Sequence, residues 1–407
     1  MRLTASVFPG WHVVAGAFCL AFFAWGAGFY GPGLYIATLS ESRGWPVSWL
    51  STAVTLHFLV SAGLVAHLPD WHRRFGIAAV TRTGVLAFAA GLLGWGWATA
   101  PWMLAPAAGL TGIGWALCSA AAINAMLIPW FDRNRPKALA MAYNGASVGG
   151  IAMTPLWAWL IAGHGFGVAS AVIAALMLAV LWPLAGLVLA RHPAALGLHA
   201  DGAPPRPPAP PAPARSRGAL LRDARFRGLS AAFAIGLFAQ MGLVTHLVSL
   251  LVPAMGVRGA GLAMSLVTIF ALLGRSLTAW LLPAGERRRL AATATFLCQA
   301  AGGAVLLLAG GDIAWLLLGC ALFGLGVGNL LSLPPLIAQA EFPAAEVGRV
   351  VALMQAINQA LYALAPAAFG LLRDGATAGT AIGVVVALQL LSAMLVLRVP
   401  RPLPPGV

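Results

Sequence analysis

Residues 168–190 read VASAVIAALMLAVLWPLAGLVLA, a run of 23 residues without a charged side chain. A helix needs about 20 consecutive apolar residues to cross a bilayer. The run is followed at once by Arg191 and a polar stretch rich in proline and arginine. This part of the chain therefore predicts a transmembrane helix that leads into a basic segment outside the membrane.

The whole chain has the composition of a membrane protein. Of its 407 residues, 60% are hydrophobic and only 8% are charged, whereas a soluble domain carries about 25% charged residues. So few charges cannot cover a soluble surface of this size. We predict twelve transmembrane helices, at residues 11–39, 47–68, 77–99, 102–129, 138–162, 168–190, 228–252, 261–282, 290–309, 313–339, 348–372 and 377–398.

The net charge of +14 indicates orientation in the membrane and not a nucleic-acid partner. The basic residues lie in short loops between apolar runs, without the soluble basic face that nucleic-acid binding requires. With the N-terminus inside, nineteen Lys and Arg residues lie in cytoplasmic segments, and only Arg43, Arg258 and Arg373 lie in outer loops. This bias predicts an inner-membrane protein with both termini in the cytoplasm. The first run is about twice as long as a signal-peptide core, so it is read as a span and not as a leader.

One long polar stretch, 191–227, divides the chain into an N-terminal half (1–190) and a C-terminal half (228–407) of six helices each. Its centre, APPRPPAPPAPA at residues 203–214, is typical of a semi-rigid linker. An offset of 211 residues aligns landmarks of the two halves, namely Gly63 with Gly274, Phe131 with Phe342, and Pro155 with Pro366. We therefore predict an all-α membrane protein of two pseudo-symmetric halves, an architecture typical of transporters with a binding site at the interface of the halves.

Motifs along nearly the whole chain carry a family resemblance. They are Gly109-Leu-Thr-Gly-Ile-Gly114, Trp130-Phe131, Arg135, the segment Ala138 to Gly150, Pro155, His246-Leu-Val-Ser-Leu-Leu251 and Gly274-Arg275. With them the chain resembles the monocarboxylate-porter and oxalate/formate-antiporter branches of the major facilitator superfamily. The resemblance implies a twelve-helix transporter of small carboxylates in which Arg275 has a functional role.

The chain also departs from these branches. The superfamily's loop motif (Gly, then Asp-Arg, then Gly-Arg) remains only as Pro69-Asp70-Trp-His-Arg73-Arg74-Phe-Gly76. Ala271 stands where monocarboxylate porters carry an Asp, and Gly31 is the nearest match to their lysine in the first span. The lysine that oxalate/formate antiporters carry in the span corresponding to 348–372 is also missing. These departures bear on the substrate and on proton coupling.

Arg275 is the sharpest candidate for a substrate-binding residue. It lies well inside the span 261–282, where a charge costs several kcal/mol unless it faces a wet cavity or a partner. All ten Asp and Glu residues fall in loops or at loop edges. The functional interpretation is that a substrate carboxylate pairs with the planar guanidinium. The alternative is an arginine that donates to helix carbonyls for structural reasons.

Other polar side chains in the spans are weaker candidates. Gln355, Asn358, Gln359 and Tyr362 share one face of the span 348–372, where they line a cavity or join helices by hydrogen bonds. Gln240 and His246 are six residues apart on one helix and so point about 120° apart. His57, His246 and Tyr30 complete the predicted substrate-binding set, with structural hydrogen bonding as the alternative for the histidines.

These residues predict a secondary transporter of a small organic anion, a mono- or dicarboxylate, that works by alternating access. The alternatives are an exporter of drug-like or hydrophobic solutes and a membrane sensor. We expect no enzyme, because no HExxH motif, catalytic triad order or carboxylate cluster is present. We also expect no metal or cofactor, since the four cysteines lie in four different runs without CxxC spacing. The expected partners are the substrate, protons or a counter-substrate, and lipid, and the expected state is a monomer.

Energy coupling has two candidate routes. Without a carboxylate in any span, either the substrate's own charge offsets Arg275 during exchange, or a histidine carries a proton. His57 is favoured by its depth in the membrane and His246 by the family resemblance.

Overall fold

The computed structural model describes residues 8–65, 67–132, 134–202, 215–281 and 288–400, which form helices and no strand. The first half of the described chain holds α1 Gly10–Gly28, α2 Gly31–Arg43, α3 Val47–Val65, α4 Leu68–Trp97, η1 Pro101–Met103, α5 Leu104–Cys118, α6 Ala120–Leu127, α7 Arg135–Leu184, η2 Ala185–Leu189, η3 Pro193–Leu196 and η4 Ala200–Gly202. The second holds α8 Arg217–Arg222, α9 Ala224–Leu281, α10 Arg288–Leu308, α11 Ile313–Val327, α12 Asn329–Glu341, α13 Ala344–Tyr362, α14 Ala365–Gly375 and α15 Ala378–Arg398.

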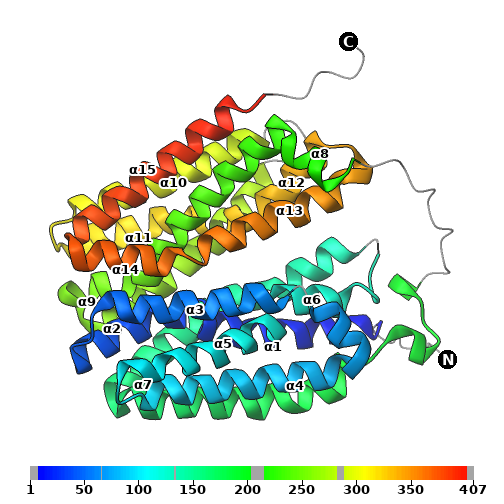
Figure 1. The fold of residues 1–407 in the computed structure, drawn as a ribbon, viewed down its shortest axis with the longest axis horizontal. Helices are drawn as coiled ribbons and strands as arrows, with labels where there is room; N and C mark the ends of the chain where they lie inside the picture. The colour runs from blue at the N-terminus through cyan, green and yellow to red at the C-terminus, as the bar shows by residue number, and fades with distance from the viewer. Residues whose placement is uncertain (1–7, 66, 133, 203–214, 282–287, 401–407) are drawn as a thin grey trace, which may run out of the picture. The chain divides into compact units, whose positions relative to one another are not determined.

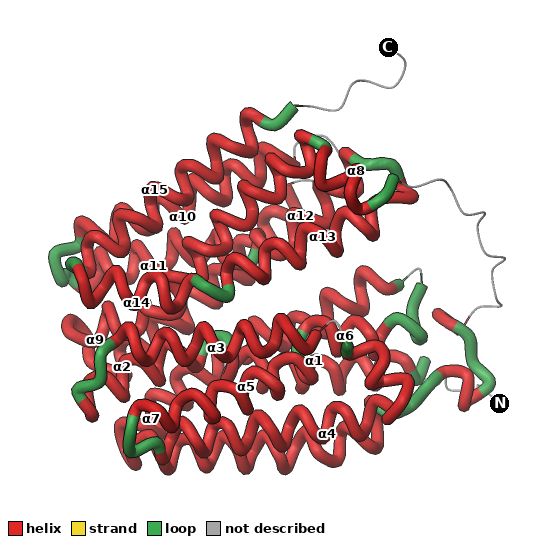
Figure 2. The backbone as a smooth tube through the Cα atoms, viewed as in Figure 1, coloured by secondary structure: helices red, strands yellow, loops and turns green. Residues whose placement is uncertain are grey.

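The described residues hold ten helical segments long and apolar enough to cross a membrane. Two of them, Lys137–Leu189 and Ala224–Thr278, have 53 and 55 residues, more than twice the length of one crossing. Each is kinked at a glycine with positive φ, Gly165 at 80° and Gly256 at 66°, a conformation that glycine adopts readily. With two crossings in each, the helices agree with the twelve predicted spans. The all-helical membrane fold is thus confirmed, and Figure 2 shows the helices of the described residues in red.

Helix contacts divide the chain into two compact units. The first is drawn from Met1–Thr38 and Leu56–Pro208, and the second from Leu39–Thr55 and Ala209–Val407. Residues 39–55 thus pack with the second unit, where the Ser48 amide donates to the Asp374 carboxylate at 2.9 Å. The predicted boundaries of the two halves stay a prediction.

In the first unit, α1, α4, α5 and α7 lie side by side (Figure 1). α1 and α7 touch backbone to backbone at Gly145 and Gly149. A Cβ atom at these positions would lie 2.1 Å from the carbonyl oxygen of Phe18 and 2.3 Å from that of Phe22. Glycines four residues apart let membrane helices approach closely and gain dispersion contacts. This crossing therefore depends on the absence of side chains at both positions.

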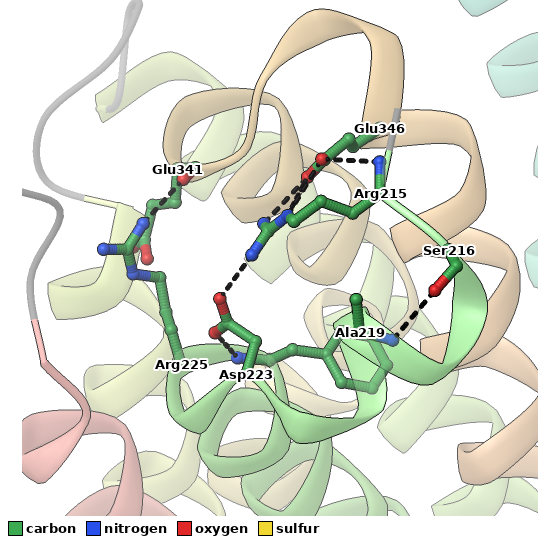
Figure 3. A network of polar contacts seen from close by, with 8 residues as sticks. Arg215, Ser216, Ala219, Asp223, Arg225, Glu341 and Glu346 are labelled. Atoms are coloured by element: carbon green, nitrogen blue, oxygen red, sulfur yellow. Dashed lines mark hydrogen bonds and ion pairs between the residues drawn. The ribbon is translucent and has the colours of Figure 1, made fainter. Parts of the chain in front are cut away.

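The chain that follows the linker is anchored to the second unit by a buried carboxylate (Figure 3). Arg215 donates to Glu346, near the start of α13, from its backbone N, its Nε and its Nη2, at 2.8–3.0 Å. Its Nη1 donates to Asp223 at 2.8 Å. The Glu346 side chain is 4% exposed and that of Arg215 is 40% exposed. The anchor fixes the segment before α8 to the start of α13.

The electrostatics of this anchor favour the charged forms of its members. Hydrogen bonds from Arg215 lower the pKa of Glu346 despite its burial, and hydrogen bonds to Glu346 and Asp223 raise the pKa of Arg215. Burial alone would raise the pKa of Asp223. The Phe226 amide and Arg215 outweigh burial, so the pKa of Asp223 is lowered. Beside the anchor, Arg225 donates to the backbone carbonyl of Glu341 at 2.9 Å.

Candidate functional site

Four membrane segments are interrupted within their length. In the described residues the interruptions lie between α1 and α2, between α5 and α6 at Ser119, between α11 and α12 at Gly328, and between α13 and α14. The backbone is extended at Ser119, with φ −97° and ψ −153°, whereas it keeps helical dihedral angles at Gly328 and at residues 363–364. Broken helices in transporters expose backbone groups that bind substrates and ions near the middle of the membrane. The candidate site residues can therefore be sorted by their distance from these breaks.

The break at Gly328 lies against the second part of α9. A Cβ atom at Gly324 would lie 2.6 Å from the carbonyl oxygen of Val267, and one at Gly328 would lie 2.3 Å from that of Ala271. These close approaches bring the end of α11 onto the turn of α9 that precedes Arg275. The first unit has a similar contact, because a Cβ atom at Gly112 would lie 2.5 Å from the carbonyl oxygen of His57.

Arg275 contacts the break directly. Its Nε donates to the carbonyl oxygen of Gly328 at 3.2 Å, and its side chain is partly buried. This bond to a helix carbonyl is the contact that the structural alternative requires. The structure therefore shows how the charge is oriented, and a role in binding stays a prediction.

Asn329, the first residue of α12, was not predicted as a site residue. Its Nδ2 donates to Thr278 Oγ1 at 3.0 Å and faces the carbonyl oxygens of Leu325 and Gly274 at 3.3 and 3.5 Å. Its Oδ1 is buried without a hydrogen-bond partner, in a residue that is 3% exposed. Buried polar atoms are rarely left unpaired, so this oxygen beside the break is a candidate acceptor for a ligand. An asparagine directly after the glycine-rich run 324–328 was the signal in the sequence.

Gln240 lies in a ladder of buried amides. Gln299 of α10 donates to Gln240 Oε1 at 2.7 Å, and Gln389 of α15 donates to Gln299 Oε1 at 2.6 Å. Such ladders join membrane helices through side chains. The contacts place Gln240 on the side of α9 that faces α10 and α15, and its role in substrate binding stays a prediction.

His246 points to a different neighbour, as the 120° separation from Gln240 predicted. Its Nε2 lies 3.0 Å from the carbonyl oxygen of Pro366, and its Nδ1 lies 3.3 Å from Nη1 of Arg373. Both partners belong to α14. Sequence reasoning missed Arg373 because it placed that residue in an outer loop.

The predicted polar face of α13 is only partly buried. Gln355 is exposed, Gln359 and Tyr362 are half-buried, and Asn358 is buried. The Oδ1 of Asn358 is buried without a partner, like that of Asn329. Asn358 thus brings a buried acceptor without a partner to this face, and the choice between cavity lining and helix packing stays open for all four residues.

His57 lies in an aromatic part of the first unit. Nδ1 of His57 lies 3.0 Å from Thr111 Oγ1, and the same hydroxyl lies 3.1 Å from the carbonyl oxygen of Ala108. Nε2 of His57 is buried without a hydrogen-bond partner. The rings of Phe58 and Trp115 lie 4.7 and 5.9 Å from the imidazole.

Tyr30 is buried at the break between α1 and α2, and its amide donates to Trp25 at 2.9 Å. Its ring contacts Phe29 at 5.0 Å. No group of His, Cys, Asp and Glu that could hold a metal ion occurs in the part of the chain that the structure describes.

The predicted residues thus fall at separate places on the two units, with Arg275 at the break in the second and His57 among aromatic rings in the first. A family model now identifies the framework that carries them, because the model of the Major Facilitator Superfamily matches residues 14–366. The chain belongs to the Major Facilitator Superfamily. It is therefore a multi-pass membrane transporter.

Solved structures of Major Facilitator Superfamily transporters share the fold. The chain is similar to the nucleoside transporter NupG (13% identity, 96% of this chain and 98% of that chain covered, TM-score 0.69). It is also similar to a D-xylose–proton symporter (13%, 96% and 98%, 0.70) and to a bacterial homologue of the human lysosomal transporter Spinster (14%, 97% and 96%, 0.65). Comparison with curated protein sequences gives no match. These identities show the fold, and the monocarboxylate or oxalate/formate branch stays a prediction.

Proposed function

We propose that this transporter carries a small organic anion, a mono- or dicarboxylate, by alternating access of its two halves. The observation that carries the proposal is Arg275, a permanent cation within an apolar segment, which donates to the carbonyl of Gly328 at the junction of α11 and α12. A planar guanidinium suits the two oxygens of a carboxylate. The unpaired Oδ1 of Asn329 beside the same break adds an acceptor for a hydroxyl or a protonated acid.

The fold alone does not select this substrate. The similar structures include a nucleoside transporter and a D-xylose–proton symporter, so one fold serves different solutes. A cationic drug would call for a buried Asp or Glu, and the predicted spans hold neither. Charge balance therefore favours an anionic substrate over the exporter alternative.

Orientation and coupling belong to the same proposal. We place the protein in the inner membrane as a monomer, with both termini in the cytoplasm, because of the bias of Lys and Arg in the loops. Transport proceeds by exchange, in which the substrate offsets the charge of Arg275, or with a proton carried by a histidine.

A thermal-shift screen of mono- and dicarboxylates on the purified protein tests the substrate class. A ligand at 100 times its Kd stabilises the folded state by about 2.7 kcal/mol. Arg82 offers a matched control, since this arginine also lies in an apolar segment and its Nε donates to a carbonyl, that of Trp182, at 3.2 Å. We expect Arg275→Gln to weaken carboxylate binding about 10- to 100-fold, the loss of hydrogen bonds to a charged group, and Arg82→Gln to leave it unchanged. Equal binding by wild type and Arg275→Gln would contradict the proposal.

A further inference from the structure

The contacts of His246 define where its proton lies. The carbonyl oxygen of Pro366 can only accept, so Nε2 of His246 carries the hydrogen and donates at 3.0 Å. The guanidinium of Arg373 can only donate, so Nδ1 is the acceptor for Nη1 at 3.3 Å. His246 is therefore the neutral Nε2–H tautomer with both nitrogens engaged. It has no lone pair left for a proton while Arg373 is in place.

The imidazole of His246 is buried close to one cation and one anion. His246 is 1% exposed, and the charged groups close enough to act on it are Arg373 and Asp374, both from α14. The carboxylate of Asp374 accepts from the amide of Ser48 at 2.9 Å. Nη1 of Arg373 also donates to Ser249 Oγ, which in turn donates to the backbone carbonyl of His246 at 2.8 Å. Arg373 thus donates to a hydroxyl and to an imidazole, and both of these acceptors are neutral.

We propose that a proton and Arg373 compete for Nδ1 of His246, so that proton uptake by this histidine releases the guanidinium from α9. The proton comes from solution and binds the lone pair that Arg373 now uses, and no covalent bond other than the new N–H forms or breaks. Two cations at hydrogen-bond distance repel each other, so the arginine must move when the ring becomes charged. The proposal goes beyond carriage of an anion, because it holds for any transported solute.

The release would be confined to one end of α14. The charged imidazole keeps its Nε2–H and can still donate to Pro366, at the first turn of the helix. Arg373 lies in the last turn, so this end loses its hydrogen bond to the imidazole of α9, while the first turn keeps its own. α14 continues the membrane segment of α13, so its last turn is the part of this segment that the release concerns. The His246–Arg373 pair therefore acts as a proton-operated latch on α14.

Nitrogen-15 NMR of histidine and arginine side chains, on the full chain in lipid nanodiscs, tests the latch. We expect the neutral ring of His246 to show its hydrogen on Nε2. On acidification, the Arg373 guanidinium signal should change at the pH at which that ring takes its second proton. His246→Gln is the matched control, because a carboxamide can donate to Pro366 and accept from Arg373 but cannot take the proton. In this variant the Arg373 signal should stay constant with pH.

Arg373→Leu provides a second test if His246→Gln does not fold. Without its competitor, His246 should bind the proton about tenfold more tightly or better, the value of a hydrogen bond to a charged group. Unchanged proton affinity in Arg373→Leu would overturn the proposal. So would a wild-type Arg373 signal that is indifferent to protonation of His246, or a neutral ring with its hydrogen on Nδ1. None of these outcomes depends on whether carboxylates bind at Arg275.

Discussion

Glu346→Gln should destabilise the second unit through the anchor behind the linker. The glutamate accepts three N–H groups of Arg215 and is 4% exposed. Gln presents an amide group to those donors and removes the charge that pairs with Arg215. Breaking a buried ion pair by removing one partner costs about 3–5 kcal/mol. Arg215 is 40% exposed and can be rehydrated, so we expect about 2–3 kcal/mol.

An exposed ion pair of the first unit supplies the control. Asp70 and Arg73 form a contact of 2.6 Å, with side chains 65% and 78% exposed, and such pairs contribute about 0.2–1 kcal/mol. The assay is the free energy of unfolding of each purified variant in detergent, from denaturant titration. We expect Asp70→Asn to lose less than about 1 kcal/mol. If Asp70→Asn and Glu346→Gln lost equal amounts, the reasoning from burial would be wrong.

The same anchor predicts a pH dependence. The pKa of Glu346 is lowered in the folded state by Arg215, so its contribution to stability is present above the unfolded value, about 4.3 for Glu, and is lost as the pH falls through the folded value. The difference between wild type and Glu346→Gln should therefore be constant from about pH 6 to 8 and shrink in acid. A difference that shrank as the pH rose would refute the assignment.

Three further predictions concern other parts of the chain. His57→Phe removes a buried ring nitrogen without a partner and loses one hydrogen bond, so the free energy of unfolding should change by no more than about 1 kcal/mol. If His57 binds the substrate, the thermal shift that a carboxylate causes in the wild type should be lost in this variant. In Gly274→Ala the new Cβ would lie 2.0 Å from the carbonyl oxygen of Leu325, so denaturant titration should show a loss of about 1–3 kcal/mol in the free energy of unfolding. Gly109→Ala is the control, because a Cβ at Gly109 has nothing within 4 Å, and it should not destabilise the protein. A cysteine in place of Arg43 should react with a membrane-impermeant thiol reagent added outside intact cells, whereas a cysteine in place of Arg217 should react only after the membrane is permeabilised. Labelling in the reverse sense would contradict the predicted orientation.

The membrane fold could be predicted from the sequence because its signals are local. Apolar runs of the length of 168–190 determine the spans without knowledge of their neighbours. The glycines at 165 and 256, which carry positive φ, lie in the short gaps between predicted spans. Segment length and glycine placement are both readable from the chain, so the predicted number of crossings agrees with the structure.

The contacts of the candidate site could not be predicted in the same way, because they join residues far apart in the chain. Arg373 reaches His246 across 127 positions, and Arg215 reaches Glu346 across 131. A loop-edge arginine and a loop-edge glutamate look like solvated charges until tertiary packing brings their partners close. Asn329 was missed for a different reason, because a single amide in an apolar run is usually a packing residue. Only the buried Oδ1 without a partner, which the structure reveals, distinguishes Asn329 from such a residue.

Counterflow in proteoliposomes tests the role of Arg275 most directly. Vesicles loaded with an excess of a carboxylate that stabilises the protein should accumulate the same labelled carboxylate from outside, without an imposed pH gradient if transport is exchange. We predict that Arg275→Gln abolishes this uptake in protein that is folded and inserted, while Arg82→Gln, its matched control, keeps it. Full counterflow by Arg275→Gln would contradict the proposal that this arginine binds the transported anion.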